Sequence, residues 1–380
     1  MELDVKAFNG EMLQPLLILE TENFCANAKE PCKHCSVEAF SNVSEESIDF
    51  NKAIDEFIAL SKGKGHVVFK NGAGALGGKE LSLIRKCIEN GLDVSITTEG
   101  VFVSEKFEEG IGVLSRQFPG KISYTVSLDG ATKEVYGLIR QEKYFEKACK
   151  FIKKQVDKGM FVSTNFVVHK GNVNHIPEYA DFAVHELGVK RINFLQLGLV
   201  GNALKNRLEI AEPKDFFEQT INVFEKGDAE IKDALESTFV KAIQDLQANP
   251  NKHFACEGCV AGSKNFAFIK SSGGIYPCSS LEAPGFLAGN IKTISLEEAM
   301  KGDAFKKARK LALQLRGNYP VVNICPGRNV SIEKDRELAE YIRCYLDKQF
   351  IAQNVLKKNS SSLLQQGMVA APPVSIAKRF

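Results

Sequence analysis

Three cysteines close to the amino terminus have the residue type and spacing of metal ligands. Six residues separate Cys25 from Cys32, and Cys35 completes a Cys-x-x-Cys pair that contains His34. Thiolate sulfur binds zinc and iron–sulfur clusters, and a loop with three thiolates leaves one coordination position open for a substrate or cofactor. The alternative is a structural zinc site with His34 or a distant residue as fourth ligand, because an isolated Cys-x-x-Cys pair commonly binds zinc.

A second group of cysteines lies in the carboxyl-terminal third of the chain. Its members are Cys256, Cys259, Cys278, Cys325 and Cys344. Four of these thiolates could hold either a tetrahedral zinc ion or an iron–sulfur cluster. The remaining two cysteines, Cys87 and Cys149, fall on expected helices without neighbouring ligands, so we expect them to be small core residues.

The composition favours a cytoplasmic protein that acts on a small molecule or a peptide. A net charge of +2 over 380 residues gives no concentrated basic face for a nucleic acid or a membrane surface. No run of about 18 apolar residues could span a bilayer, and the acidic start Met1–Asp4 is unlike a signal peptide. In a reducing compartment the ten cysteines stay free of disulfides, which favours metal binding or catalysis.

The elements that must position these cysteines form a repeat of strands and helices. Short apolar runs alternate with amphipathic stretches, which indicates parallel strands joined by helices. The expected strands are Leu16–Leu19, Val67–Lys70, Val94–Thr98, Ser123–Leu128, Val162–Val168 and Arg191–Leu197. Helices are expected to begin at Ser44–Ser47 and Ser104–Phe107 and to end at Gly91, Gly159 and Gly188.

Six strand-helix units are too few for a closed eight-stranded barrel. The sequence therefore predicts an α/β fold, a partial (β/α)6 TIM-like barrel with ligands at the carboxyl ends of the strands. The pattern changes near Ala211, and a hairpin is expected where Phe266–Ile269 and Ile275–Pro277 flank Gly273 and Gly274. We assign residues 1–210 to the barrel core, 211–250 to a helical linker, 251–356 to a small α+β domain and 357–380 to a disordered tail.

The first cysteine group resembles that of the radical S-adenosylmethionine superfamily. In that superfamily three cysteines hold a 4Fe-4S cluster, and the residue before the last one is usually aromatic, a position that His34 occupies here. Most members have three residues between the first two cysteines. This chain has six, from Ala26 to Pro31.

The resemblance continues in order along the expected strand ends of residues 14–205. Gly72, Ala73 and Gly74 lie where the superfamily usually has a Thr-Gly-Gly-Glu-Pro turn that receives the methionine end of the cofactor, and Ala73 replaces the acidic residue. Ser95–Gly100 resembles the usual Thr-Thr-Asn-Gly ending of the third strand, and Ser127–Thr132 resembles the ending of the fourth. The resemblance implies that the residues near S-adenosylmethionine are His34, Gly72, Ala73, Gly74, Thr98, Ser127, Asp129 and Asn165.

The second cysteine group resembles the SPASM or twitch extension of the same superfamily. In that extension a cysteine and a glycine-tipped hairpin ending in Pro-Cys hold an auxiliary iron–sulfur cluster. The resemblance implies that Cys259, Cys278, Cys325 and Cys344 are the ligands, with Cys256 as an alternative. The full seven-cysteine pattern is absent, which favours one auxiliary cluster over two.

The resemblance implies an enzyme that reductively cleaves S-adenosylmethionine to a 5'-deoxyadenosyl radical, which abstracts hydrogen from a substrate. We expect a peptide or protein substrate, as in maturases that oxidise or cross-link peptides, and an electron donor such as flavodoxin or ferredoxin. A small-molecule or sugar dehydrogenase is an alternative. Ala73 and the long cysteine gap motivate another, an iron–sulfur scaffold protein that does not cleave the cofactor. A zinc-stabilised barrel with acid-base chemistry is disfavoured because no paired carboxylates or histidine triad share a strand end, and the sequence identifies no catalytic side chain.

Overall fold

Strands and helices alternate through most of the chain. The computed structural model describes residues 14–22, 25, 27, 29–35, 48–70, 76–235, 240, 259–315, 334, 336–338, 340–342 and 344–345. The strands are β1 (Leu16–Leu19), β2 (His66–Lys70), β3 (Asp93–Thr98), β4 (Ile122–Ser127), β5 (Phe161–Val168), β6 (Arg191–Gln196), β7 (Phe266–Ile269), β8 (Gly274–Tyr276) and β9 (Gly289–Asn290). Every strand that the sequence predicts is present to within one residue at each end.

The helices follow the strands in the expected order. Those of the first half are α1 (Asn51–Ser61), α2 (Gly78–Glu89), α3 (Glu105–Gln117), α4 (Lys133–Gly137), α5 (Phe145–Asp157) and α6 (Ile176–Asp181). Those of the second half are α7 (Asn202–Lys205), α8 (Pro213–Lys226), α9 (Ala229–Ala234), α11 (Leu296–Lys301) and α12 (Asp303–Leu315). None of the helices described is long and apolar enough to cross a membrane.

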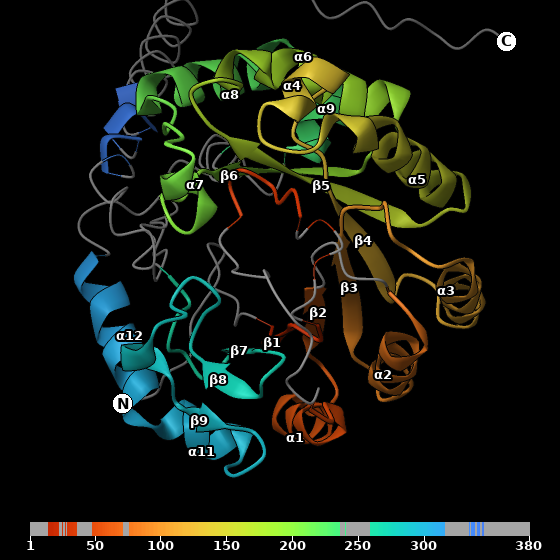
Figure 1. The fold of residues 1–380 in the computed structure, drawn as a ribbon, viewed down its shortest axis with the longest axis vertical. Coiled ribbons are helices and arrows are strands. Elements are labelled where there is room, and N and C mark those ends of the chain that lie inside the picture. The colour runs from red at the N-terminus through yellow and green to blue at the C-terminus, as the bar shows by residue number, and fades with distance from the viewer. Residues whose placement is uncertain are drawn as a thin grey trace, which may run out of the picture.

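All nine strands belong to one curved sheet, in the order β6-β5-β4-β3-β2-β1-β7-β8-β9. Strands β1 to β6 are parallel to their neighbours, and β7 pairs in parallel with β1. The sheet does not close on itself, and Figure 1 shows it as an arc with the helices of the first half outside it. The prediction of a partial barrel is confirmed.

The outer face of the sheet is apolar because it packs against these helices. Val126 and Ile96 are fully buried, and the ring of Tyr124 on β4 meets Phe151 of α5 edge to face at 5.3 Å. Burial of each such side chain stabilises the fold by about 1.5 to 3 kcal/mol. Cys87, fully buried, belongs to this core, as expected, and Cys149 packs partly buried at its edge.

The inner face of the arc carries a row of hydrogen-bonded polar side chains. His66 Nε2 lies 2.9 Å from Ser95 Oγ, which lies 2.6 Å from Ser123 Oγ. On the next strands Thr125 Oγ1 lies 2.8 Å from Ser163 Oγ. Because alternate residues of a strand face opposite sides, these side chains line the face away from the helices. We name them the hydroxyl ladder.

The residues expected to begin and end helices have the predicted local geometry. Ser104 Oγ accepts a hydrogen bond of 3.3 Å from the backbone N–H of Phe107 at the start of α3. Gly91, Gly159 and Gly188 all have positive φ where helices end, which glycine adopts without a steric cost. The expected helix start at Ser44–Ser47 lies outside the described residues, as does the tail 357–380.

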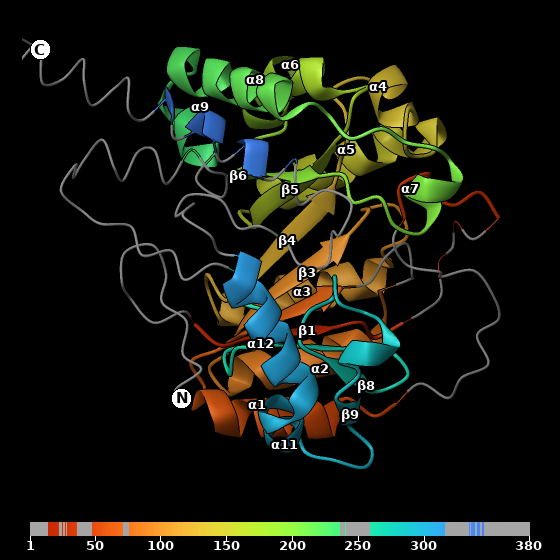
Figure 2. The same cartoon turned by 90° about the vertical axis from the view of Figure 1, so that its left-hand side faces the viewer.

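The carboxyl-terminal elements extend the barrel sheet on its β1 side. Strands β7 and β8 form the expected antiparallel hairpin, with Gly273 at φ +88° in its turn. Helix α11 docks on α1, where Lys52 Nζ donates to the Ile291 carbonyl at 2.7 Å and Glu56 accepts from the Leu296 N–H. Figure 1 shows α11 and β9 beside α1, and Figure 2 shows α12 crossing in front of β1.

Candidate functional site

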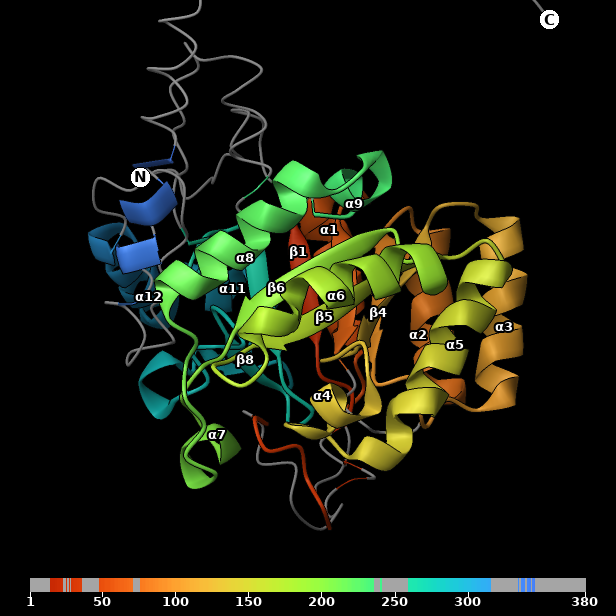
Figure 3. The same cartoon turned by 90° about the horizontal axis from the view of Figure 1, so that it is seen from above.

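The first cysteine group lies on the loop that leaves the carboxyl end of β1. Cys25, Cys32 and Cys35 are half-buried cysteines. The Cys35 N–H donates to the Cys32 carbonyl at 3.2 Å, which closes a tight turn around His34. In Figure 3 this loop, α4 and α7 lie on one side of the molecule. The cysteines therefore stand at the carboxyl ends of the strands, the position where ligands bind in such sheets.

Two short segments hold the cysteine loop by its backbone. The Lys33 N–H donates to the Ile139 carbonyl at 2.9 Å. From α7, the Asn202 N–H donates to the Cys35 carbonyl at 2.9 Å, and Asn202 Nδ2 donates to the Cys32 carbonyl at 3.3 Å. These bonds fix the loop through its backbone carbonyl and N–H groups.

Arg140 is the centre of a charged network beneath the loop. Its Nε contacts Asp129, and its Nη1 donates to Glu99 Oε1 at 2.8 Å and to Cys32 Sγ at 3.6 Å. Its Nη2 lies 3.5 Å from His34 Nε2. The side chains of Arg140, Glu99 and Asp129 are only 7%, 10% and 0% exposed, so these charges interact with little screening by water.

The network shifts the proton affinities of its members. Burial raises the pKa of Cys32 well above its usual value; Arg140 opposes this shift and Glu99 adds to it. Loss of hydration, together with Arg140, lowers the pKa of His34 to about 4, so its ring is neutral at neutral pH. Burial alone would lower the pKa of Arg140, but Asp129 and Cys32 hold it well above its usual value. The guanidinium is therefore a permanent positive charge beside the Cys32 sulfur.

Four of the residues expected near the cofactor, Thr98, Ser127, Asp129 and Asn165, lie at strand ends that the structure describes. Their side chains do not all face the same side of the sheet. Ser127 and Asn165 face the inside of the arc and are neighbours in register, and Asn165 Oδ1 accepts from Asn193 Nδ2 at 3.0 Å. Thr98 has the parity of the helix-facing residues, and its hydroxyl accepts from the Gly100 N–H at 3.1 Å. Asp129 is fully buried and is engaged by Arg140 and the Val167 N–H.

Two of the expected auxiliary ligands pack against the same part of the molecule. Cys259 and Cys278 both contact a small apolar cluster of Ala261, Leu281 and Ala308. Cys344 is exposed on a helical segment, and its neighbour Tyr345 packs against Phe217 of α8. Cys256 and Cys325 lie outside the described residues, as do Gly72, Ala73 and Gly74.

The residue types of the first loop suit an iron–sulfur cluster. Clusters of this kind take cysteine thiolates as ligands, and the loop has three half-buried cysteines with the Arg140 cation beside one of them.

Sequence reasoning did not identify Arg140, Glu99 or Asn202 as functional residues. Their role depends on contacts between segments that lie 41 to 170 residues apart, such as Arg140 with Glu99 and Asn202 with Cys32. The sequence did carry one signal for Arg140. It lies 11 residues after Asp129, in the segment that follows β4, and the end of that strand resembles a cofactor site.

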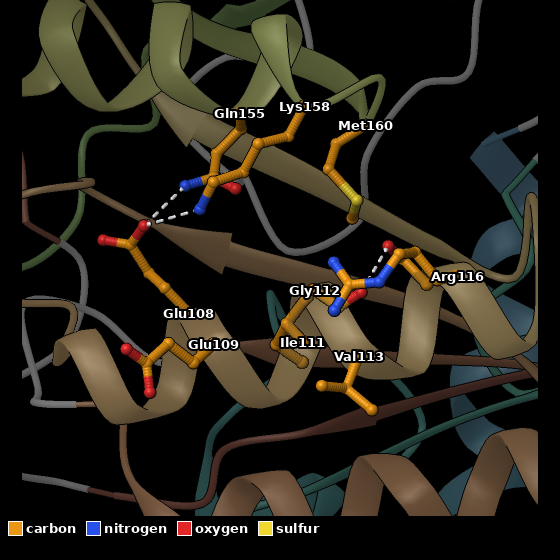
Figure 4. Close-up of a pocket in the computed structure, with 10 residues that line it drawn as sticks. Glu108, Glu109, Ile111, Gly112, Val113, Arg116, Gln155, Lys158 and Met160 are labelled. Atoms are coloured by element: carbon orange, nitrogen blue, oxygen red, sulfur yellow. Dashed lines mark hydrogen bonds and ion pairs between the residues drawn. The ribbon is translucent and has the colours of Figure 1, made fainter.

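A separate hollow of about 460 Å³ lies between α3 and α5 on the helical layer (Figure 4). Glu108, Gln155, Lys158, Arg116 and Met160 are among its lining residues, and the figure shows Gln155 and Lys158 pointing toward Glu108. No cysteine lines it. Because it lies outside the sheet, it belongs to a different face of the molecule from the cysteine loop.

Comparison with known proteins shows what the chain is similar to. Residues 256–327 match the SPASM family, an iron-sulfur cluster-binding domain. This match confirms the prediction of an iron–sulfur domain after the barrel. Together with the relatives and solved structures described next, it confirms the resemblance to radical S-adenosylmethionine enzymes with a SPASM-type domain.

Curated relatives include PqqA peptide cyclases of two bacteria. The protein of Methylorubrum extorquens strain PA1 is 24% identical over 211 residues, which cover 54% of this chain and 51% of the relative. That of Methylobacterium nodulans is 24% identical over 276 residues, covering 70% and 68%. The chain thus spans about half the length of the curated relatives it matches first.

Solved structures share the fold over most of the chain. Native anSMEcpe with bound AdoMet aligns with a TM-score of 0.64 and 16% identity, covering 88% of this chain and 98% of that one. Streptococcus suis SuiB bound to S-adenosylmethionine aligns with a TM-score of 0.62 and 16% identity, covering 84% and 75%. These likenesses confirm the fold class.

Proposed function

We propose that this protein is a radical S-adenosylmethionine enzyme that modifies a peptide. The observation that carries the proposal is the braced loop of Cys25, Cys32 and Cys35 at the carboxyl edge of an open barrel, with a SPASM-type domain continuing the same sheet. When bound, the reduced cluster and S-adenosylmethionine supply a 5'-deoxyadenosyl radical that removes hydrogen from an unactivated carbon.

The chain's own residues bind, orient and shield these groups. Cys25, Cys32 and Cys35 hold the first 4Fe-4S cluster, and the glycine-rich segment at Gly72 to Gly74 receives the cofactor with its backbone. Ser127 and Asn165 are neighbours on the inside of the arc, which supports a role for both beside the cofactor and substrate. The outer helices and the apolar outer face keep water from the back of the sheet.

An auxiliary cluster belongs to the carboxyl-terminal segment. Cys259 and Cys278 supply two ligands, and Cys325 and Cys344 supply the others, with Cys256 as the alternative for one of them. The convergence of Cys259 and Cys278 on one apolar cluster supports the first pair. The division into a core of 1–210, a linker of 211–250 and an auxiliary domain of 251–356 is part of this proposal.

A peptide substrate is supported by the names of the relatives and neighbours. The curated relatives are peptide cyclases, and one anSMEcpe structure holds both AdoMet and the Cp18Cys peptide. We propose a small electron donor such as flavodoxin or ferredoxin, and a cytoplasmic location where thiols stay reduced. Cofactor cleavage in the absence of any substrate would separate an enzyme from a scaffold protein.

The test is to purify the chain without oxygen and measure iron, sulfide and zinc, then record the spin-resonance spectrum of the reduced protein with and without S-adenosylmethionine. We expect about eight irons per chain for two 4Fe-4S clusters, a spectrum that the cofactor changes, and production of 5'-deoxyadenosine. In Cys32→Ser we expect loss of the cofactor-sensitive signal and of about half the iron, with no 5'-deoxyadenosine.

Cys149→Ser is the matched control, because Cys149 is a half-buried thiol on α5 away from both cysteine groups. It should keep both clusters. Zinc without sulfide in the wild-type protein would contradict the proposal. Intact clusters whose spectrum ignores the cofactor would support the scaffold alternative instead.

A further inference from the structure

We propose that Arg140 is a positioning residue that locks the cysteine loop onto the barrel and sets the reduction potential of the first cluster through Cys32. The inference rests on the proposed function, since it needs a cluster on Cys25, Cys32 and Cys35. It goes further by assigning a role to Arg140 and to Glu99.

The guanidinium group uses three nitrogens in three directions. Nε contacts the carboxylate of Asp129, which the Val167 N–H also holds in place. Nη1 lies 2.8 Å from Glu99 Oε1, and the other oxygen of Glu99 accepts from Asn27 Nδ2 at 2.7 Å. The planar fork of arginine is thus fixed by two carboxylates that are themselves anchored.

The remaining contacts of Arg140 go to the cysteine loop. Nη1 lies 3.6 Å from Cys32 Sγ, within the range of a hydrogen bond to sulfur, and Nη2 lies 3.5 Å from His34 Nε2. The backbone on either side of Arg140 joins in, because the Ile139 carbonyl accepts from the Lys33 N–H and Gln141 Nε2 donates to the Glu30 carbonyl. One short segment after α4 therefore holds the loop from residue 30 to residue 34.

The charges of this network act on the Cys32 sulfur with opposite signs. Arg140 places a positive charge beside it, and the Cys32 thiol donates a hydrogen bond of 3.3 Å to Oε1 of Glu99, which brings a negative charge equally close. Reduction adds negative charge to a cluster, so a nearby cation stabilises the reduced state and a nearby anion destabilises it. Hydrogen bonds to cluster sulfurs tune the potential in the same way. Arg140 should raise the potential, and Glu99 should lower it.

A contribution to folding stability alone does not explain the contacts that Arg140 makes. An ion pair as buried as Arg140 with Asp129 is often no more stabilising than apolar residues of the same volume, because both charges lose their hydration. Here the arginine also reaches two residues of the cysteine loop. The network therefore holds a positive charge, the guanidinium of Arg140, next to the Cys32 sulfur.

The experiment measures the midpoint potential of the cofactor-sensitive cluster in Arg140→Gln, Arg140→Lys and Glu99→Gln by redox titration with spin-resonance detection. We expect Arg140→Gln to weaken reduction about tenfold, a fall of about 59 mV for one electron. Glu99→Gln should shift the potential in the opposite direction. Arg140→Lys keeps the charge but loses the fork, so its shift should be smaller, with lower iron occupancy.

Arg85→Gln is the control, because Arg85 is an exposed arginine on α2 paired only with Glu89 among the described contacts. If Arg140→Gln does not assemble a cluster, the other two variants test the inference. The midpoint potential should then fall in Arg140→Lys and rise in Glu99→Gln. Unchanged potentials in all assembled variants would overturn the inference, even if iron occupancy falls. Failure of the proposed function looks different: the wild-type protein would then lack a cofactor-sensitive cluster, or Cys32→Ser would keep it.

Discussion

Individual charged side chains have two distinct roles in this protein. Around Arg140 they surround the Cys32 sulfur, whereas around Glu108 they join two helices on the outside of the barrel. Glu108 accepts from Gln155 Nε2 at 3.0 Å and pairs with Lys154 at 2.7 Å. Burial raises the pKa of Glu108, but hydrogen bonds from Lys154 and Gln155 outweigh it and hold the pKa below its usual value.

We predict that Glu108→Gln lowers the stability of the cluster-free protein by about 1 kcal/mol at neutral pH, since the lysine partners are half-exposed. A carboxylate with a depressed folded pKa stabilises the fold above its unfolded pKa of about 4.3, and this contribution disappears as the pH falls through the folded value. Urea unfolding of both proteins at pH 7 and at stepwise lower pH measures the difference. Glu109→Gln, one residue away and exposed, is the control. A constant difference at every pH would contradict the prediction.

At the scale of elements, short helices act as braces. Helices α4 and α7 have five and four residues, too few to be stable alone. Both helices, with their flanking residues, form hydrogen bonds with the cysteine loop, and these bonds hold the loop in place. The loop should therefore open locally at a lower free energy than the barrel core.

Asn202→Ala removes one such brace while leaving the backbone of α7 intact. The lost hydrogen bond to the Cys32 carbonyl should lower the free energy of loop opening by about 1 kcal/mol, which is about a fivefold change. Peptide-resolved alkylation of Cys32 and Cys35 in the cluster-free protein should speed up by that factor. Asn90→Ala removes a bond of the same kind at the end of α2 and should leave the rate unchanged. Equal rates in Asn202→Ala and wild type would show that the brace contributes nothing.

At the scale of the whole molecule, the sheet unites the two cysteine groups. Strand β7 pairs with β1 in parallel, so the hairpin near Cys278 and the loop after β1 are supported by adjacent strands. On the outer side, Glu56 of α1 accepts the Leu296 N–H at the start of α11, which makes it a second cap from another element, beside the N-cap Ser295 of α11 itself.

Loss of this cap should loosen the carboxyl-terminal segment. Glu56→Ala is predicted to cost about 1 kcal/mol and to speed up proteolysis around α11 and α12, because their docking on α1 weakens. Glu89→Ala, which removes an exposed carboxylate paired with Arg85 on α2, is the control. Limited proteolysis with mass spectrometry compares the cleavage rates. Identical cleavage of Glu56→Ala and wild type would contradict the predicted docking role.

The sequence predicts local features of this fold better than contacts between distant segments. Strand positions follow from alternating apolar residues, and helix ends follow from Gly91, Gly159 and Gly188, because both signals act over a few residues. The first cysteine loop could be located for the same reason. The pairing of β7 with β1 joins residues about 250 positions apart, since Leu16 faces Phe266, and no local pattern records it. The contacts of Arg140 could not be predicted for the same reason, because its partners Cys32 and Glu99 are distant in the sequence.

The hydroxyl ladder is hydrogen-bonded largely within the sheet. Ser123 Oγ can donate to the Val94 carbonyl at 3.4 Å or to Ser95 Oγ at 2.6 Å, and Ser95 Oγ also lies 2.9 Å from His66 Nε2. Likewise Ser163 Oγ can donate to the Tyr124 carbonyl at 3.1 Å or to Thr125 Oγ1 at 2.8 Å. Each hydroxyl of the ladder therefore has an acceptor within the sheet for its single hydrogen. What remains at these hydroxyls is chiefly lone pairs, so this strip of the inner face is better suited to accepting hydrogen bonds than to donating them.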